Sequence, residues 1–165
     1  MSHSIELPVT ANKPQLYREL ALQLTGLLTG ERDPIANSAN TASLLYHALP
    51  EVNWVGFYFF KEGELVLGPF HGKPACVRIA LDRGVCGAAA TARKSIVVPD
   101  VHRFPGHIAC DSASRSELVV PLVRGDGLVG VLDLESPLAG RFDEEDRAGC
   151  EEMAAIYLAA CEVDA

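Results

Sequence analysis

The stretch 116–136, SELVVPLVRGDGLVGVLDLES, reads as two β-strands joined by a short turn, and it decides the fold that the rest of the chain can adopt. Near its end, Asp133 and Glu135 alternate with Leu132 and Leu134. Successive side chains of a strand point to opposite faces of a sheet, so both carboxylates lie on one face and both leucines on the other. We expect the leucines to face packed helices, which leaves the acidic face free to hold a ligand.

A third carboxylate, Glu117, joins this acidic face only if the two strands pair in the right register. If the turn consists of three residues, 125–127, counting back along both strands sets Glu117 opposite Glu135. A two-residue turn would place Glu117 on the opposite face. We therefore predict a three-residue turn with a positive φ at Gly127, unless a β-bulge near Pro121 corrects the register.

Three clustered carboxylates would matter both for binding and for acid–base chemistry. Their mutual repulsion should raise at least one pKa and leave a proton to donate, while the others bind a cationic group such as an ammonium. The alternative interpretation is a solvated acidic strand face, because exposed carboxylates are common.

Helical and strand patterns on both sides of this hairpin predict an α+β domain. Apolar periodicity, capping residues and Pro or Gly boundaries predict helices over 14–28, from Asp33 to Pro50, over 84–93 and over 143–161. Runs of β-branched and aromatic residues predict strands over 53–61, 64–70, 76–80 and 95–98. An antiparallel sheet of five or six strands, with the N- and C-terminal helices packed on one face, would form a single domain over 1–165.

The five cysteines are distributed unevenly over this pattern. Cys76, Cys86 and Cys110 lie in irregular or element-terminal sequence, and Cys110 belongs to the stretch 100–115, which has no periodicity and predicts a long loop. Loops of this length in compact domains are usually functional or disordered. Cys150 and Cys161 lie about three helical turns apart in a predicted helix, so they share a face and are expected in the core.

Charge and composition limit the classes of partner. The formal net charge of −8 disfavours nucleic acids and anionic membranes, which both attract basic surfaces. No apolar run reaches the roughly 18 residues that cross a bilayer, and the first residues lack the pattern of a secretory signal, so we expect a soluble cytoplasmic protein. In that reducing compartment, cysteines are more often catalytic, redox-sensing or metal-binding than structural disulfides.

Segments along nearly the whole chain resemble the free methionine-(R)-sulfoxide reductases, which are small enzymes built on the GAF fold. The resemblance is carried by NWVGFYFF, LGPFHGKPACVRI, RGVCGAAA, DVHRFPGHIACDSASRSELVVP and GVLDLESP, and by three cysteines spaced ten and twenty-four residues apart. It implies a GAF fold with a ligand pocket under loops on the face opposite the helices. It also implies free L-methionine-(R)-sulfoxide as substrate, no bound cofactor or metal, and thioredoxin as external reductant.

The same resemblance assigns roles to particular residues. It makes Cys110 the nucleophile and Cys76 and Cys86 the resolving or relay thiols. It places in the substrate pocket Trp54, Tyr58, Glu117, Asp133 and Glu135. Glu135 departs from the family pattern, which has Asp at this position, and its extra methylene would narrow the pocket or move the carboxylate. Trp54 and Tyr58 share a strand face and would surround the methyl-sulfinyl group, whereas without the resemblance they would be expected in the core.

These residues suit the reduction of a sulfoxide, which needs a soft nucleophile for sulfur and a proton source for oxygen. We expect the Cys110 thiolate to attack the sulfur while an acid near Glu117 or Asp133 protonates the oxygen. The resulting sulfenic acid on Cys110 would condense with Cys76 or Cys86 to a disulfide, which thioredoxin-type exchange would reduce.

Two other classes of protein remain open from the sequence. A GAF module that senses a small molecule without chemistry would share the fold and give the thiols no special role. A zinc protein would use Cys76, Cys86, Cys110 and His102 or His107, but the chain has no pair of cysteines two to four residues apart, which is the usual zinc signature. The apolar faces of the terminal helices are compatible with a homodimer.

Overall fold

The computed structural model describes residues 12–107 and 112–161. The helices are α1 (Lys13–Leu28), α2 (Pro34–Ala48), α3 (Gly84–Ala92) and α4 (Glu144–Ala160), with a 3₁₀ turn at Val101–Arg103. The strands are β1 (Trp54–Lys61), β2 (Glu64–His71), β3 (Arg78–Ala80), β4 (Ile96–Val98), β5 (Ser116–Arg124) and β6 (Gly127–Ser136).

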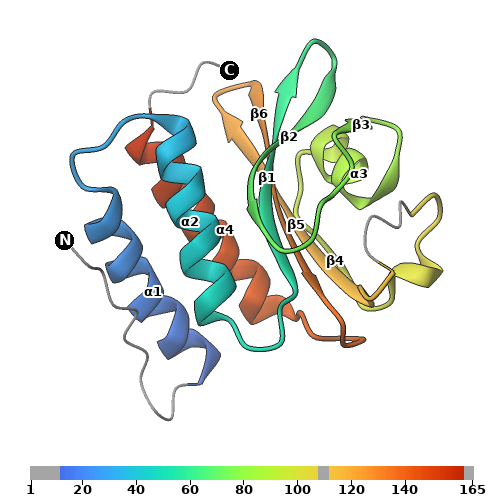
Figure 1. The fold of residues 1–165 in the computed structure, drawn as a ribbon, viewed down its shortest axis with the longest axis horizontal. Helices are drawn as coiled ribbons and strands as arrows, with labels where there is room; N and C mark the ends of the chain where they lie inside the picture. Colours follow the sequence, from blue (N-terminus) through green and yellow to red (C-terminus); the bar gives the residue numbers. More distant parts are fainter. Residues whose placement is uncertain (1–11, 108–111, 162–165) are drawn as a thin grey trace.

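The six strands form one antiparallel sheet with helices on both faces. The strand order is β3-β2-β1-β6-β5-β4, so the two longest strands, β5 and β6, lie side by side near the middle. Helices α1, α2 and α4 lie on one side of this sheet, whereas α3 lies on the other with the loops that follow β2 and β4 (Figure 1). The α+β architecture predicted from the sequence is confirmed.

Side-chain caps explain where the long helices begin. The Asn12 side chain accepts a hydrogen bond from Gln15 N, and Asp33 accepts two from the first turn of α2, where Pro34 occupies the first position. Asp143 and Asp146 form a reciprocal capping box at the start of α4.

Among the described residues, no helix has both the length and the apolar character needed to span a bilayer.

The β5–β6 hairpin has no three-residue turn; it follows the stated alternative, in which a β-bulge near Pro121 corrects the register. The turn holds two residues, Gly125 and Asp126, and the positive φ of 58° is at Gly125 rather than at Gly127. Such a glycine at the first turn position is what a type II′ turn requires. The register then shifts by one residue next to Leu122, where Val129 is bulged out of the pairing, and Glu117 faces Glu135 as predicted.

Two apolar clusters fill the two sides of the sheet. The larger cluster contains Leu132 and Leu134 with side chains of α1, α2 and α4. The smaller one contains Trp54 and Tyr58 with side chains of α3. The leucines therefore face the three-helix layer, as the alternation in 132–135 predicts, and α3 and loops cover the opposite face.

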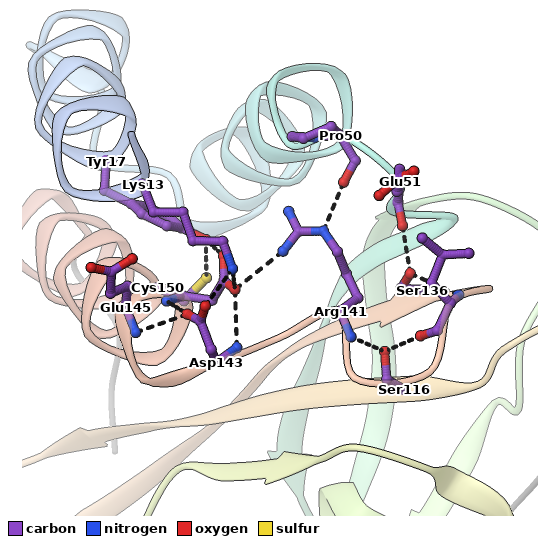
Figure 2. A network of polar contacts seen from close by, with 12 residues as sticks. Lys13, Tyr17, Pro50, Glu51, Ser116, Ser136, Arg141, Asp143, Glu145 and Cys150 are labelled. Carbon is purple, nitrogen blue, oxygen red and sulfur yellow. Dashed lines mark hydrogen bonds and ion pairs between the residues drawn. The ribbon is translucent and has the colours of Figure 1, made fainter. Parts of the chain in front are cut away.

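A buried polar network joins α1 to α4 on the helical side (Figure 2). Asp146 is fully buried, and its carboxylate accepts hydrogen bonds from Lys13 Nζ at 2.6 Å, Tyr17 Oη at 2.9 Å and Arg141 Nη1 at 3.1 Å. Tyr17 Oη also lies 3.7 Å from Cys150 Sγ. Burial raises the pKa of Cys150 to about 12, so this thiol stays protonated and packs as a core side chain.

The core interpretation of the C-terminal cysteines is confirmed. Cys150 and Cys161 are both free and buried, and Cys161 forms the C-cap of α4 rather than part of its interior. Both contribute to the larger apolar cluster, far from the face that α3 covers.

Candidate active site

A cavity lies between the sheet and α3. Strands β1, β5 and β6 form its floor, the segment 73–75 and Ile79 form one side, and the first residues of α3 form another. His107 closes it from the loop before β5. Because the floor comes from the centre of the sheet, the side chains that project from it are held by well-paired backbone.

The three carboxylates predicted to share a face do meet in this cavity. Glu117, Asp133 and Glu135 are 4%, 4% and 8% exposed. Glu117 pairs with Glu135 across the hairpin, and Asp133 lies on the same face two residues before Glu135. The alternative of a solvated acidic face is therefore wrong.

Burial and mutual repulsion raise the pKa values of the clustered carboxyl groups. Burial raises the pKa of Glu117 well above its usual value, and the charges of Asp133 and Glu135 raise it further. Burial and the charge of Glu135 likewise raise the pKa of Asp133. The cavity therefore favours the protonated form of at least one of these carboxyl groups.

One carboxylate oxygen of this cluster has no hydrogen-bond partner among the described residues. Asp133 Oδ1 is buried, and the described residues offer it no hydrogen bond. A buried carboxylate oxygen without a donor is costly, which indicates that a proton or a cationic ligand group completes the site.

Two residues that the sequence reasoning missed hold Glu135 in place. Ser114 Oγ donates a short hydrogen bond to Glu135 Oε2, and Asn53 Nδ2 lies 3.5 Å from the same serine oxygen. Asn53 N also donates to the Glu135 carbonyl at 3.0 Å. Ser114 lies 21 residues before Glu135 at the end of a loop without periodicity, so no sequence pattern links the two.

An aromatic wall stands beside the carboxylates. The rings of Trp54 and Tyr58 stack with centroids 6.0 Å apart, and Phe70 stacks on the other side of Trp54 at 5.4 Å. Trp54 Nε1 donates to the Lys73 carbonyl at 3.0 Å. Trp54 and Tyr58 thus share a face, as predicted, and both line the cavity.

Gly56, between these two aromatic residues, was also missed. A Cβ atom at Gly56 would overlap the Trp54 ring and contact Phe70 Cβ. The glycine in the sequence NWVGFY therefore leaves the space into which the indole ring folds. A glycine inside a strand is the signal that could have indicated this close approach.

The three predicted active-site cysteines differ in oxidation state and in whether the structure describes them. Cys86 is the third residue of α3 and lines the cavity as a free, buried thiol, with Sγ 3.9 Å from Glu117 Oε1. Burial raises the pKa of this thiol, and the neighbouring charges of Asp133 and Glu117 raise it further. Cys76 is disulfide-bonded, and its carbonyl accepts a hydrogen bond from Tyr58 Oη at 2.9 Å. Cys110 lies outside the described residues.

His107 lies at this cavity, and so do the described residues that could together bind a metal ion. His107 Nδ1 lies 3.8 Å from Glu117 Oε2, and burial lowers the pKa of His107. Among the described residues, the group able to hold a metal is Cys86, Glu117 and Asp133, whose ligand atoms lie within 4.8 Å of one another. This set has one cysteine and two acids, and Cys76 is committed to a disulfide, so the described residues do not supply the cysteine-rich zinc site considered from the sequence.

Comparison with known proteins agrees with this architecture. The GAF domain family matches residues 39–160. The chain is 57% identical to protein YtsP of Bacillus subtilis, over 83% of this chain and 85% of that protein. It is 48% identical to the free methionine-R-sulfoxide reductase of Escherichia coli, over 87% of each chain. The structure of the free methionine-R-sulfoxide reductase of Neisseria meningitidis in complex with its substrate superposes with a TM-score of 0.92 and 43% identity, covering 96% of this chain and 95% of that one.

Proposed function

We propose, because this chain belongs to the free methionine-R-sulfoxide reductase family of GAF-domain proteins, that it reduces free L-methionine-(R)-sulfoxide to methionine by thiol chemistry. The observation that carries this proposal is the convergence of Glu117, Asp133 and the Cys86 thiol in one cavity. Trp54 and Tyr58 line the same cavity and provide apolar surface for the methyl-sulfinyl end of the substrate.

In the first step, the Cys110 thiolate attacks the sulfoxide sulfur. The sulfur–oxygen bond of the substrate breaks as the oxygen passes to Cys110, so the sulfoxide is reduced by two electrons and the cysteine is oxidised to a sulfenic acid. The leaving oxygen needs a proton, and the carboxylic proton that burial retains at Glu117 or Asp133 is a source for it. Methionine then leaves.

In the second step, a resolving thiol attacks the Cys110 sulfenic acid, a disulfide forms and water leaves. Cys76 fits this role because it already takes part in a disulfide, while the three other described cysteines are free. The Cys86 thiol is buried beside Glu117, and its raised pKa disfavours the thiolate, so it suits a later exchange better than the first attack.

In the third step, an external dithiol of the thioredoxin type reduces the disulfide by thiol exchange and becomes oxidised itself. No metal or organic cofactor is needed for any of these steps. The electrons come from the external dithiol, and the protons are exchanged with cavity carboxyls and water.

The test is an assay of the two methionine sulfoxide epimers, free and peptide-bound, with a thioredoxin reducing system. The protein should turn over the free (R) epimer, and Cys110→Ser should abolish turnover. Cys161→Ser is the matched control, because this cysteine lies at the C-cap of α4 and should leave turnover unchanged. Binding of the sulfoxide without turnover would instead identify a sensing module.

A further inference from the structure

Three side chains able to bind a metal ion converge in the cavity from three different elements. Cys86 comes from α3, Glu117 from β5 and Asp133 from β6, and all three are buried. One ligand atom of each lies within 4.8 Å of the other two, and Cys86 Sγ is 3.9 Å from Glu117 Oε1. Two ligands of one tetrahedral zinc ion lie roughly 3.3 to 3.8 Å apart, because Zn–O and Zn–S bonds are about 2.0 to 2.3 Å long. The three side chains therefore need to move closer by only about 1 Å or less to share one ion.

The Asp133 carboxylate has one oxygen that a cation would complete. Asp133 lines the cavity and is 4% exposed, and its Oδ1 atom has no hydrogen-bond partner among the described residues. A buried carboxylate oxygen without a donor is costly. A metal ion that takes this oxygen as a ligand removes the cost, because the ion supplies the opposite charge directly.

Close packing holds the Cys86 thiol beside the sheet. Gly87, the next residue of α3, lies so near the end of β3 that a Cβ atom there would come within 2.6 Å of the Ala80 carbonyl oxygen. One helical turn further along, Thr91 Oγ1 donates to the Leu81 carbonyl at 2.9 Å. Helix α3 is thus fixed against the segment 80–81. The ligand from the helix and the ligands from the sheet are both held in place before an ion binds.

The types of ligand select the ion. A thiolate favours zinc over magnesium and calcium, which prefer oxygen ligands. Three protein ligands leave the fourth position of a tetrahedral zinc ion open to water, as in zinc sites that are not purely structural. This set therefore differs from the cysteine-rich site considered from the sequence, and it does not need Cys76, which is disulfide-bonded. The thiol proton of Cys86 passes to solvent when the thiolate binds the ion.

We propose that Cys86, Glu117 and Asp133 form a site for one zinc ion, which acts on this protein as an inhibitor and not as a cofactor. The inhibitory part rests on the proposed function. The ion occupies the carboxyl groups that would give a proton to the sulfoxide oxygen, and it also takes up the Cys86 thiol. The protein would then be inactive while zinc is bound and active again once a chelator removes it.

The experiment measures zinc binding to the protein with the Cys76 disulfide formed, in the absence of chelators and dithiols. Titration calorimetry and metal analysis should give one zinc ion per chain. Cys86→Ser and Asp133→Asn should each weaken binding at least about tenfold, a loss that even indirect partners of a metal ion cause. The matched controls are Cys161→Ser at the C-cap of α4 and Asp126→Asn in the exposed turn, and both should bind zinc as the wild type does.

Cobalt(II) in place of zinc reports on the ligands directly, because a cobalt–thiolate bond adds an absorption band in the near ultraviolet. The wild type should show this band, and Cys86→Ser should lack it while its circular dichroism stays that of the folded protein. A wild type that binds cobalt without the thiolate band would overturn the proposal. So would equal zinc affinity of the wild type, Cys86→Ser and Asp133→Asn, or no zinc binding at all.

Failure of this site can be told apart from failure of the proposed function. Zinc should suppress the turnover of free methionine sulfoxide, and excess EDTA should restore it. Zinc binding that depends on Cys86 and Asp133, in a protein without any sulfoxide turnover, would reject the reductase and keep the metal site. Turnover that continues unchanged while the site is saturated with zinc would keep the reductase and reject the inhibitory role.

Discussion

Glu117 on β5 lies directly opposite Glu135 on β6, although the turn between these strands holds two residues and not three. The one-residue shift at Leu122, which leaves Val129 unpaired, compensates for the shorter turn. Without it, the period of two along a strand would have put Glu117 into the helical core. The composition of the cavity thus depends on a bulge several residues away from any group that lines it.

Asp133→Asn should make the protein more stable at alkaline pH. The raised pKa means that folding keeps a proton on this carboxyl that the unfolded chain releases above about pH 4. The free energy of unfolding of the wild type therefore falls as pH rises from about 4 through the raised folded-state pKa. Each pKa unit by which the folded state exceeds the unfolded state corresponds to about 1.4 kcal/mol of this free energy. Urea unfolding from pH 4 to 9 should show a smaller decline in Asp133→Asn, with Asp126→Asn in the exposed turn as control.

Ser114→Ala should weaken substrate binding more than it slows the chemical step. The serine hydroxyl donates to Glu135 Oε2, so its loss removes one of the contacts that orient the carboxylate in the cavity. We expect a rise in KM of about tenfold with a change in kcat of less than threefold, consistent with one lost hydrogen bond to a charged group. Ser112→Ala, at an exposed position of the same loop, should behave as wild type. A fall in kcat with unchanged KM would place Ser114 in the chemistry instead.

Gly56→Ala should damage both stability and binding, because the new methyl group would overlap the Trp54 ring. Overpacking of this kind costs about 1 to 3 kcal/mol, and displacing the indole would reshape the aromatic wall. Gly26→Ala in α1 is the matched control. Nothing lies within 4 Å of the added atom there, so the helix should gain about 0.5 to 1 kcal/mol. Tryptophan fluorescence reports on the displacement directly, since Trp54 is the single tryptophan.

Asp146→Ala should destabilise the fold and leave the activity of the folded protein intact. The substitution removes the carboxylate that pairs with both Lys13 and Arg141. Breaking a buried ion pair lowers the free energy of unfolding by about 3 to 5 kcal/mol. Glu144→Ala breaks an exposed pair with Arg147 on the same helix and should cost less than about 1 kcal/mol. Chemical unfolding measures both values. A loss of kcat/KM at full folding would mean that the network also acts on the cavity.

The sequence could predict what depends on local periodicity. The alternation of Leu132, Asp133, Leu134 and Glu135 placed two carboxylates on the correct face, and capping residues located the starts of α2 and α4. The turn was predicted wrongly because Gly125, Asp126 and Gly127 suit both a two-residue and a three-residue connection. The pairing of the rest of β5 with β6 decides between the two connections. The turn sequence alone does not predict that pairing.

Contacts between distant segments could not be predicted. Hydrogen bonds connect Ser114 with Asn53 and Glu135, which are distant in the sequence, and no sequence pattern predicts these contacts. The same holds for the hydrogen bond from Tyr58 to the Cys76 carbonyl, which ties the segment before β3 to the floor of the cavity. The assignment of Cys110 as nucleophile stays a prediction, as do thioredoxin as reductant and a homodimer.

Both outermost strands of the sheet, β3 and β4, are only three residues long. A foreign chain that tried to extend the sheet at either outermost strand would find only three residues to pair with, and short edge strands are a common protection against such pairing. The two short edges therefore protect the folded protein against edge-to-edge pairing with a second sheet.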